Sequence, residues 1–199
     1  MSIYDRTYMS SYGKGFQWNL TLKIIALNAI CFLIQSIIER TSGAAFLQKY
    51  IYLSREGLSH AFVWQLLTFQ FMHSGFFHLL FNSLGIFFIG RAIEKQLSPE
   101  KYLFMYLFAG IIGGILQIGL TFFLPGMNGY VVGASAGLFG LLAAFGLILG
   151  HEIITMLLFF ILPISFPGRL LIPLGIIISV LGIFGDGSIK IAQRLVSIP

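Results

Sequence analysis

A serine flanked by small residues has the most specific chemistry in this sequence. Ser135 lies in the stretch Gly133–Gly137, which reads GASAG, at the start of an apolar run that continues to Gly150. A serine hydroxyl is a nucleophile only when a neighbouring base takes its proton. Charge that develops on the attacked carbonyl oxygen must also meet preorganised hydrogen-bond donors. Residues that could supply those groups must therefore come from elsewhere in the chain.

A second interpretation of this stretch involves no catalysis. Gly133 and Gly137, then Ala136 and Gly140, are four residues apart and would leave one helix face nearly bare. Such a face lets a neighbouring helix approach closely within a membrane. Ser135 would then bond to a carbonyl one turn earlier, and the stretch would only pack helices.

His78 and Asn82 are the candidate donors. They are four residues apart in the apolar segment Phe76–Gly90, so they share one face of a helix. Polar side chains in a membrane helix usually face the bundle interior or a water-filled cavity. The pair either bonds neighbouring helices together or belongs to a site.

The composition indicates a polytopic helical membrane protein of one domain. The 199 residues are 57% hydrophobic and 10% charged, with a mean hydropathy of +0.92, whereas soluble chains are about 25% charged. The net charge of +5 comes from basic residues spread singly between apolar runs. This pattern argues against nucleic acid as a partner.

Apolar runs long enough to approach a bilayer's thickness predict five spanning helices. They cover 20–38, 76–90, 99 to about 123, 135–150 and 169–184. Residues 39–75 mix charged and large apolar side chains, which predicts an amphipathic insert at the membrane surface with Trp64 in the interface. Residues 151–168 predict a partly buried connection.

The chain divides into a cytoplasmic leader (1–19), a membrane domain (20–185) and a polar tail (186–199). The basic residues place the N-terminus inside and the uncharged loop after the third helix outside. Five crossings would then put the basic tail outside, which conflicts with the positive-inside rule.

Several motifs together resemble the rhomboid family of intramembrane serine proteases. The resemblance runs from about Thr21 to Phe184. It rests on the stretch 64–68 (WQLLT), His73, His78, Asn82, the stretch 90–94 (GRAIE), Gly133-Ala134-Ser135 and Gly137.

The resemblance implies an all-α, rhomboid-like bundle of five transmembrane helices with an interfacial first loop. Ser135 matches the nucleophile, and His78 and Asn82 match the side chains that stabilise the oxyanion, helped by the backbone N–H of Ser135. His73 matches a histidine that we expect to be structural. The implied reaction is acyl transfer without metal or cofactor. The implied substrates are membrane-anchored proteins, cleaved within or near their transmembrane segments. The expected location is the lipid bilayer of a bacterial plasma membrane, and the oligomeric state stays unspecified.

The sequence departs from the family pattern at two places. Ala136 stands where the family has glycine directly after the serine, and its methyl group could crowd the oxyanion site. The family also carries its base as a histidine in a sixth helix, whereas residues 191–193 here read IAQ. His151 follows Ser135 by 16 residues, which is roughly 24 Å along a helix. His60 and His73 lie in the first loop.

We therefore expect the chain alone to be inactive or severely weakened as a protease. One alternative is a rhomboid-like pseudoprotease that binds transmembrane segments without cutting them. Another is a truncated product of an active protease. A channel or transporter fits less well, because the sequence has few membrane-embedded charges and no paired discontinuous helices.

Overall fold

The structure is a computed structural model that describes residues 18–41, 43–123, 129–158 and 162–177. These ranges are mostly helical and include one two-stranded antiparallel sheet. The predicted tail (186–199) and almost all of the predicted leader lie outside them.

Three described helices are long and apolar enough to cross a bilayer, by length and composition. They are α1 (Leu20–Arg40), the continuous helix Phe76–Glu94 and α7 (Pro99–Phe123). Two shorter apolar helices, α8 (Ser135–Ile148) and Gly168–Ile177, follow them. This confirms the predicted helical polytopic bundle, although the end of the predicted fifth helix lies outside the described residues.

The second span has three consecutive parts. It begins as α5 (Phe76–Gly85), widens into a π-helical segment, η3 (Ile86–Gly90), and ends as α6 (Arg91–Glu94). The Glu94 carboxylate at its end accepts hydrogen bonds from the Thr21 backbone N–H (3.1 Å) and hydroxyl (2.6 Å). A carboxylate at the N-terminus of a helix is favoured by the helix dipole. The end of the second span is thereby fixed to the start of α1.

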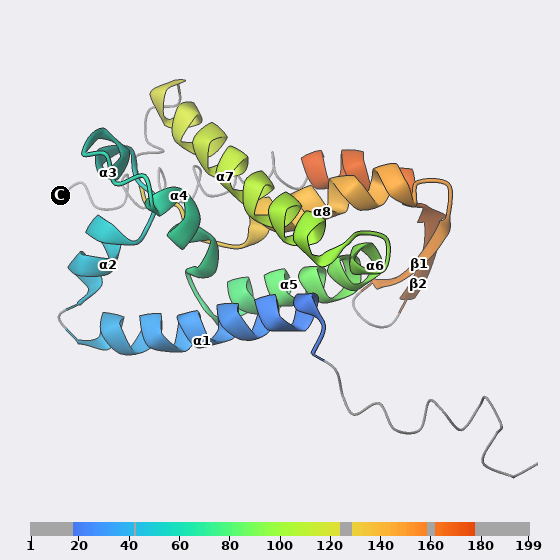
Figure 1. The fold of residues 1–199 in the computed structure, drawn as a ribbon, viewed down its shortest axis with the longest axis horizontal. Helices are drawn as coiled ribbons and strands as arrows, with labels where there is room; N and C mark the ends of the chain where they lie inside the picture. The colour runs from blue at the N-terminus through green and yellow to red at the C-terminus, as the bar shows by residue number, and fades with distance from the viewer. Residues whose placement is uncertain (1–17, 42, 124–128, 159–161, 178–199) are drawn as a thin grey trace, which may run out of the picture.

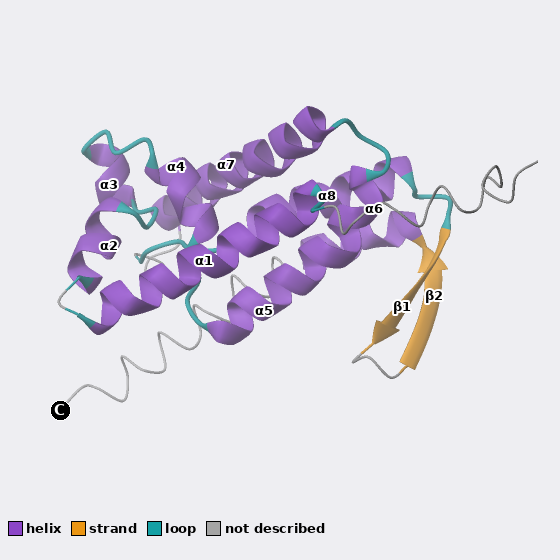
Figure 2. Cartoon of the chain, turned by 60° about the horizontal axis from the view of Figure 1, so that its bottom comes forward, coloured by secondary structure: helices purple, strands orange, loops and turns teal. Residues whose placement is uncertain are grey.

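The helices form one bundle with different structures at its two ends (Figures 1 and 2). The segment between α1 and α5 lies at one end and folds into α2 (Ala44–Tyr50), α3 (Arg55–Ser59), α4 (Gln65–Thr68) and a 3-10 turn, η2 (Phe69–Phe71). We call residues 43–75 the first-loop insert. The two strands lie at the opposite end, beyond α8 and α6.

A buried glutamine organises the first-loop insert. The Gln65 side chain is fully buried, accepts a hydrogen bond from the Ser54 N–H (3.2 Å) and donates one to the Lys49 carbonyl (2.8 Å). Large apolar side chains of the insert stay exposed, namely Phe46, Val63, Trp64 and Leu67. Both features fit the prediction of an amphipathic insert at the membrane surface.

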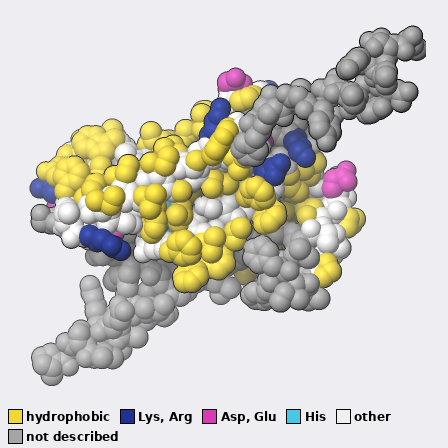
Figure 3. Space-filling model, turned by 90° about the horizontal axis from the view of Figure 1, so that it is seen from below, with side chains coloured by type: hydrophobic (Ala, Val, Ile, Leu, Met, Phe, Trp, Pro, Cys, Tyr) yellow, Lys and Arg dark blue, Asp and Glu magenta, His cyan; other side chains and the backbone are white. Residues whose placement is uncertain are grey.

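The surface of the bundle is suited to lipid. In the view of Figure 3, hydrophobic side chains cover most of the visible described surface, and lysine and arginine side chains lie towards its edges. Exposed aromatic side chains continue along α5 and α7, among them Phe77, Phe81 and Phe104. Exposed apolar surface of this extent is stable when lipid, rather than water, covers it.

Small residues let α7 and α8 approach closely. A Cβ placed on Gly137 would lie 2.7 Å from the Tyr106 ring, one on Gly113 would lie 2.5 Å from the Ala136 Cβ, and one on Gly140 would overlap the Ala109 Cβ. The predicted packing face is therefore present, and α7 is its partner.

Gly110 and Gly114 of α7, predicted as a close-packing face, have a different partner. A Cβ on Gly114 would lie 2.8 Å from Leu53 and 2.9 Å from Phe69, and one on Gly110 would overlap the amide of Gln70. All three neighbours belong to the first-loop insert. The glycines of α7 therefore accommodate this insert on one side and α8 on the other.

The connection after α8 differs from the one predicted. It forms a β-hairpin of β1 (Ile153–Leu158) and β2 (Leu162–Pro167), and Ile153 is 69% exposed. The run is too short to span a membrane as a helix, and β-branched residues favour strands. Pro167 stands at the end of its strand, where a proline is tolerated.

The contact of α7 with α8 generates a prediction. Gly140→Ala should lower the free energy of unfolding by roughly 2 kcal/mol, because the new methyl group meets Ala109, whose Cβ cannot rotate away. Gly119→Ala in α7 is the matched control, because a Cβ there meets nothing within 4 Å, and alanine should stabilise that helix by up to about 1 kcal/mol. Thermal unfolding in detergent measures both. Equal effects of the two substitutions would contradict the packing described.

Candidate active site

Ser135 is the first residue of α8, and Ala134 is its N-cap. The first N–H groups of a helix have no partner within the helix, so they are available to a negatively charged oxygen beside Ser135. The Ser135 hydroxyl is partly buried and makes no hydrogen bond to any residue that the structure describes. The bond to a preceding carbonyl in the packing interpretation cannot form, because no helical turn precedes this serine.

Gly133 brings His78 and Ser135 to the same place. A Cβ on Gly133 would lie 2.8 Å from His78 Nε2 and 3.7 Å from Ser135 Oγ. Its φ of +128° is a conformation that only glycine adopts without strain. A side chain at this position would therefore be strained and would also fill the space between the imidazole and the hydroxyl.

The loop before α8 is held by the first-loop insert. The Gly133 N–H donates to the Phe69 carbonyl (3.0 Å), and Leu53 and Val131 form an isolated antiparallel bridge. These contacts fix the loop two residues before Ser135. The sequence indicated neither bond, because the partners lie more than 60 residues apart.

His78 is oriented by Ser74. Its Nδ1 lies 2.9 Å from the Ser74 hydroxyl oxygen and accepts a longer bond, 3.4 Å, from the Ser74 backbone N–H. Ser74 stands four residues before His78, in the last turn before α5. The sequence analysis missed Ser74, although the spacing of four residues is a signal that could have found it.

Asn82 lies one turn further along α5 and is buried, 5% exposed. Its amide nitrogen donates to the His78 carbonyl (3.0 Å), which leaves the second N–H of the amide free to donate elsewhere. No hydrogen bond joins Asn82 to Ser135 in the part of the chain that the structure describes. The structure thus places His78 beside Ser135, and it places Asn82 one turn further along the helix that carries His78.

Ala136 does not crowd the oxyanion site as the sequence suggested. Its Cβ is directed at α7, where a Cβ on Gly113 would lie only 2.5 Å away. The methyl group therefore belongs to the contact between α7 and α8, and Gly137 belongs to it as well. The departure from the family's glycine is accommodated on the side of α8 that faces α7.

His73 is fully buried directly behind His78. The two rings are 5.3 Å apart in an edge-on arrangement. Gln35 of α1 holds the His73 backbone from both sides: its amide accepts from the His73 N–H (2.9 Å) and donates to the His73 carbonyl (2.7 Å). Within the part of the chain that the structure describes, neither ring nitrogen of His73 has a hydrogen-bond partner. Burial, and secondly the nearby His78, lower the pKa of His73 to about 4.

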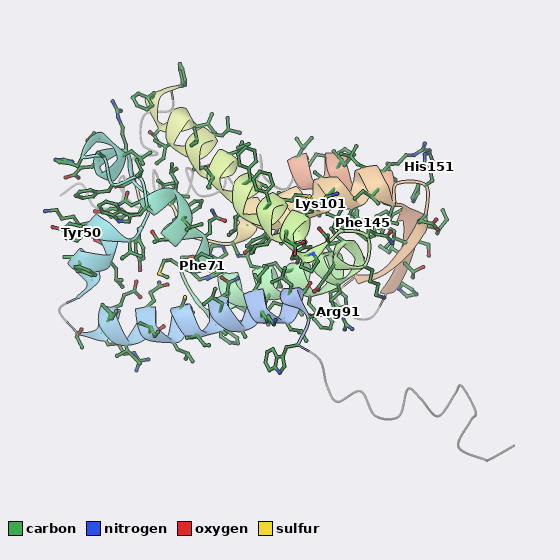
Figure 4. All side chains as sticks on the ribbon, in the orientation of Figure 1. Tyr50, Phe71, Arg91, Lys101, Phe145 and His151 are labelled. Carbon is green, nitrogen blue, oxygen red and sulfur yellow. The ribbon has the colours of Figure 1, made fainter. Side chains whose placement is uncertain are left out.

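The other two histidines lie far from Ser135. His151 follows the end of α8, beside the strands (Figure 4). His60 is exposed in the first-loop insert, with its Nδ1 2.9 Å from the Glu56 carbonyl. Of the four histidines in the sequence, therefore, only His78 and His73 lie near the site.

The buried position of His73 generates a prediction about pH. The pKa of His73 is about 6.5 in the unfolded chain and about 4 in the folded chain. Between these pH values the unfolded chain binds a proton at His73 and the folded chain does not. The contribution of His73 to the free energy of unfolding is therefore fully present above about pH 6.5. It falls as the pH is lowered, and about 2 kcal/mol is lost at roughly pH 5. His73→Gln should lose correspondingly less stability between about pH 7.5 and 5 than the unsubstituted chain.

Unfolding measured in detergent at both pH values tests this, with His60→Gln as the control at an exposed histidine. An unchanged pH dependence in His73→Gln would show that other groups cause the acid sensitivity.

Comparisons with known proteins show which family this chain resembles. The sequence model of the Rhomboid domain matches residues 60–192. YdcA of Bacillus subtilis, whose name assigns it provisionally to the rhomboid proteases, is 38% identical over 45% of this chain and 43% of its own length. Rhomboid protease GluP of the same organism is 31% identical over 62% of this chain and 23% of its own length.

A third relative carries a different description. Inactive RHOMBOID-like protein 8 of Arabidopsis thaliana is 30% identical over 41% of this chain and 22% of its own length. The matches span less than half the length of each of these relatives. The domain match covers more than half of this chain and agrees with the helical, lipid-suited bundle. The chain is thus an integral, multi-pass membrane protein that belongs to the rhomboid family.

Proposed function

We propose that this chain carries the site of a rhomboid-type serine endopeptidase, with Ser135 as the nucleophile. His78 and Asn82 are the side chains that donate to the oxyanion, and the backbone N–H of Ser135 is a third donor. The family membership and the relatives named as proteases support this assignment.

The observation that carries the proposal is the convergence at Gly133. The His78 imidazole and the Ser135 hydroxyl lie on either side of Gly133, a position that has no side chain. A carbonyl group placed there would have its carbon beside Ser135 Oγ and its oxygen beside His78 and the N-terminus of α8. A helix-packing role alone would not require this gap to stay open.

The proposed chemistry is acyl transfer. Ser135 Oγ attacks the peptide carbonyl carbon, and the electron pair displaced onto the oxygen is stabilised by the donors, each worth about 3 to 4 kcal/mol of barrier. The C–N bond then breaks, and the amine leaves with the proton that came from the hydroxyl. Water next hydrolyses the acyl-enzyme and restores the serine.

The position of the site suggests the substrate class. Ser135 begins a short helix, and the loop before it is bound to the first-loop insert, so we infer that water reaches it from the side of that insert while lipid surrounds the helices. We infer that the substrates are membrane-anchored proteins, cleaved in or near their membrane segments. We place the protein in a bacterial plasma membrane, in keeping with its Bacillus subtilis relatives.

A second function is favoured by one observation. Ser135 Oγ has no hydrogen bond to a base among the residues that the structure describes, and an unactivated serine is a poor nucleophile. A rhomboid-like protein that binds transmembrane segments without cutting them would have such a site. The relative named as inactive fits this alternative.

A fluorophosphonate probe separates the two functions, because it reacts with activated serines whatever the natural substrate. Because the chain alone is expected to be severely weakened, we expect weak labelling of the purified chain in lipid, and no labelling of Ser135→Ala. Gly133→Ala should also abolish labelling, because its methyl group would enter the gap beside His78. Ser36→Ala, on the side of α1, is the control and should label normally.

Labelling that persists in Ser135→Ala would contradict the assignment of the nucleophile. No labelling of a chain shown to be folded would support the non-catalytic alternative. Binding of a fluorescent transmembrane peptide by that same chain would then be the expected result.

A further inference from the structure

We propose that Glu39 is a positioning residue that holds together the two segments that lead to His78 and to Ser135. Its carboxylate is the common hydrogen-bond acceptor of Gln35 and Tyr52. The effect on catalysis rests on the proposed function, whereas the anchoring of the two segments does not depend on it.

Glu39 lies in the last turn of α1, and one oxygen of its carboxylate, Oε1, accepts both hydrogen bonds. Gln35 Nε2 donates to it from 3.2 Å, and the Tyr52 hydroxyl donates to it as well. Both donor residues are buried, whereas Glu39 itself is exposed. A negative charge at the C-terminal end of a helix is disfavoured by the helix dipole, so the two donors, rather than the helix, stabilise the carboxylate at this place.

The first branch leads from Glu39 to His78. The Gln35 nitrogen that donates to Glu39 also donates to the His73 carbonyl, and the amide oxygen accepts from the His73 N–H. An amide turned by half a rotation would direct its oxygen at two acceptors, the carboxylate and the His73 carbonyl. Glu39 therefore favours the one amide orientation in which both backbone groups of His73 are bonded. The helix α5 begins three residues later and carries His78.

The second branch leads to Ser135. The Tyr52 ring lies edge-on against the Tyr130 ring, with the centroids 6.2 Å apart. Leu53, the next residue, exchanges both backbone hydrogen bonds with Val131 (3.2 and 2.8 Å). This bridge lies four residues before Ser135. The bond from the Tyr52 hydroxyl to the carboxylate therefore fixes the segment with which the loop before α8 is paired.

The carboxylate fixes the spacing of the two segments, because each of its donors belongs to a different one. Glu39→Ala would leave both buried donors without this acceptor. A hydrogen bond to a charged group changes an equilibrium by about tenfold or more, so each segment should open about tenfold more often. Glu39→Gln keeps an oxygen acceptor at the same reach and should restore most of the anchoring. Tyr52→Phe should release the second branch alone.

Hydrogen exchange of backbone N–H groups tests the anchoring, by NMR of the chain in lipid with ¹⁵N-labelled histidine and valine. In Glu39→Ala the His73 and Val131 N–H groups should both exchange about tenfold faster. In Tyr52→Phe only the Val131 N–H should exchange faster. The His60 N–H at the end of α3 is bonded within that helix and is the internal control, which should not change. Each signal is assigned by its loss when that residue is substituted.

Unchanged exchange at His73 and Val131 in Glu39→Ala would overturn the proposal. Equal acceleration at His60 would also overturn it, because the substitution would then loosen the chain as a whole. The rate of fluorophosphonate labelling is the catalytic readout. Its maximal value should fall about tenfold in Glu39→Ala and recover in Glu39→Gln. The half-saturating probe concentration should stay the same, because no group beside Ser135 is altered.

Glu56→Ala, at an exposed carboxylate of α3, is the matched control and should label like the unsubstituted chain. A chain that shows the expected exchange but no labelling would uphold the role of Glu39 and contradict only the proposed protease activity. Labelling that requires Ser135 but keeps its rate in Glu39→Ala would leave the proposed function intact and refute the positioning role.

Discussion

The close approach of α7 and α8 is the constraint on which the position of Ser135 depends. Lipid supplies no hydrophobic force between helices, so packing of the backbones must hold them together. Gly137 and Gly140 provide that contact against Tyr106 and Ala109. Because the contact begins at Ala136, one residue after Ser135, it also fixes the axis of the helix whose N-terminus faces the candidate site. The stretch GASAG therefore packs α8 against α7, and this packing leaves Ser135 at the N-terminal end of the helix, where the proposed chemistry would take place.

Hydrogen bonds from polar side chains to the backbone fix the segments of the fold that helix packing does not hold. Gln35 fixes the turn at His73, Gln65 fixes the first-loop insert, and Glu94 fixes the start of α1. Buried polar groups are costly in a membrane protein unless they are paired. Gln35 and Gln65 satisfy backbone groups of irregular segments, and Glu94 satisfies N–H groups in the first turn of α1 that have no partner within the helix.

The spans could be predicted from the sequence, because their length and apolarity are set by the thickness of the bilayer. The approach of His78 to Ser135 followed from residue types and spacing together with the family resemblance. The short helices of the first-loop insert could not be predicted, because they depend on partners such as Lys49 and Gln65 that meet only in the fold. The hairpin after α8 was missed because a short apolar run does not by itself distinguish a strand from a buried connection. The direction of the Ala136 methyl group could not be predicted, because the sequence does not show which way a side chain points.

The π-helical segment Ile86–Gly90 determines how the side chains before it and after it are rotated relative to one another about the axis of the second span. A π turn holds more residues than an α turn, and one residue of an α-helix corresponds to a rotation of about 100°. His78 precedes this segment and lies beside Gly133 and Ser135, whereas Glu94 follows it and is bound to α1. The two halves of one continuous helix therefore present their polar faces in different directions. A chimera or an alignment that removed a single residue here would keep His78 and Glu94 and still rotate one of them relative to the other by about 100°.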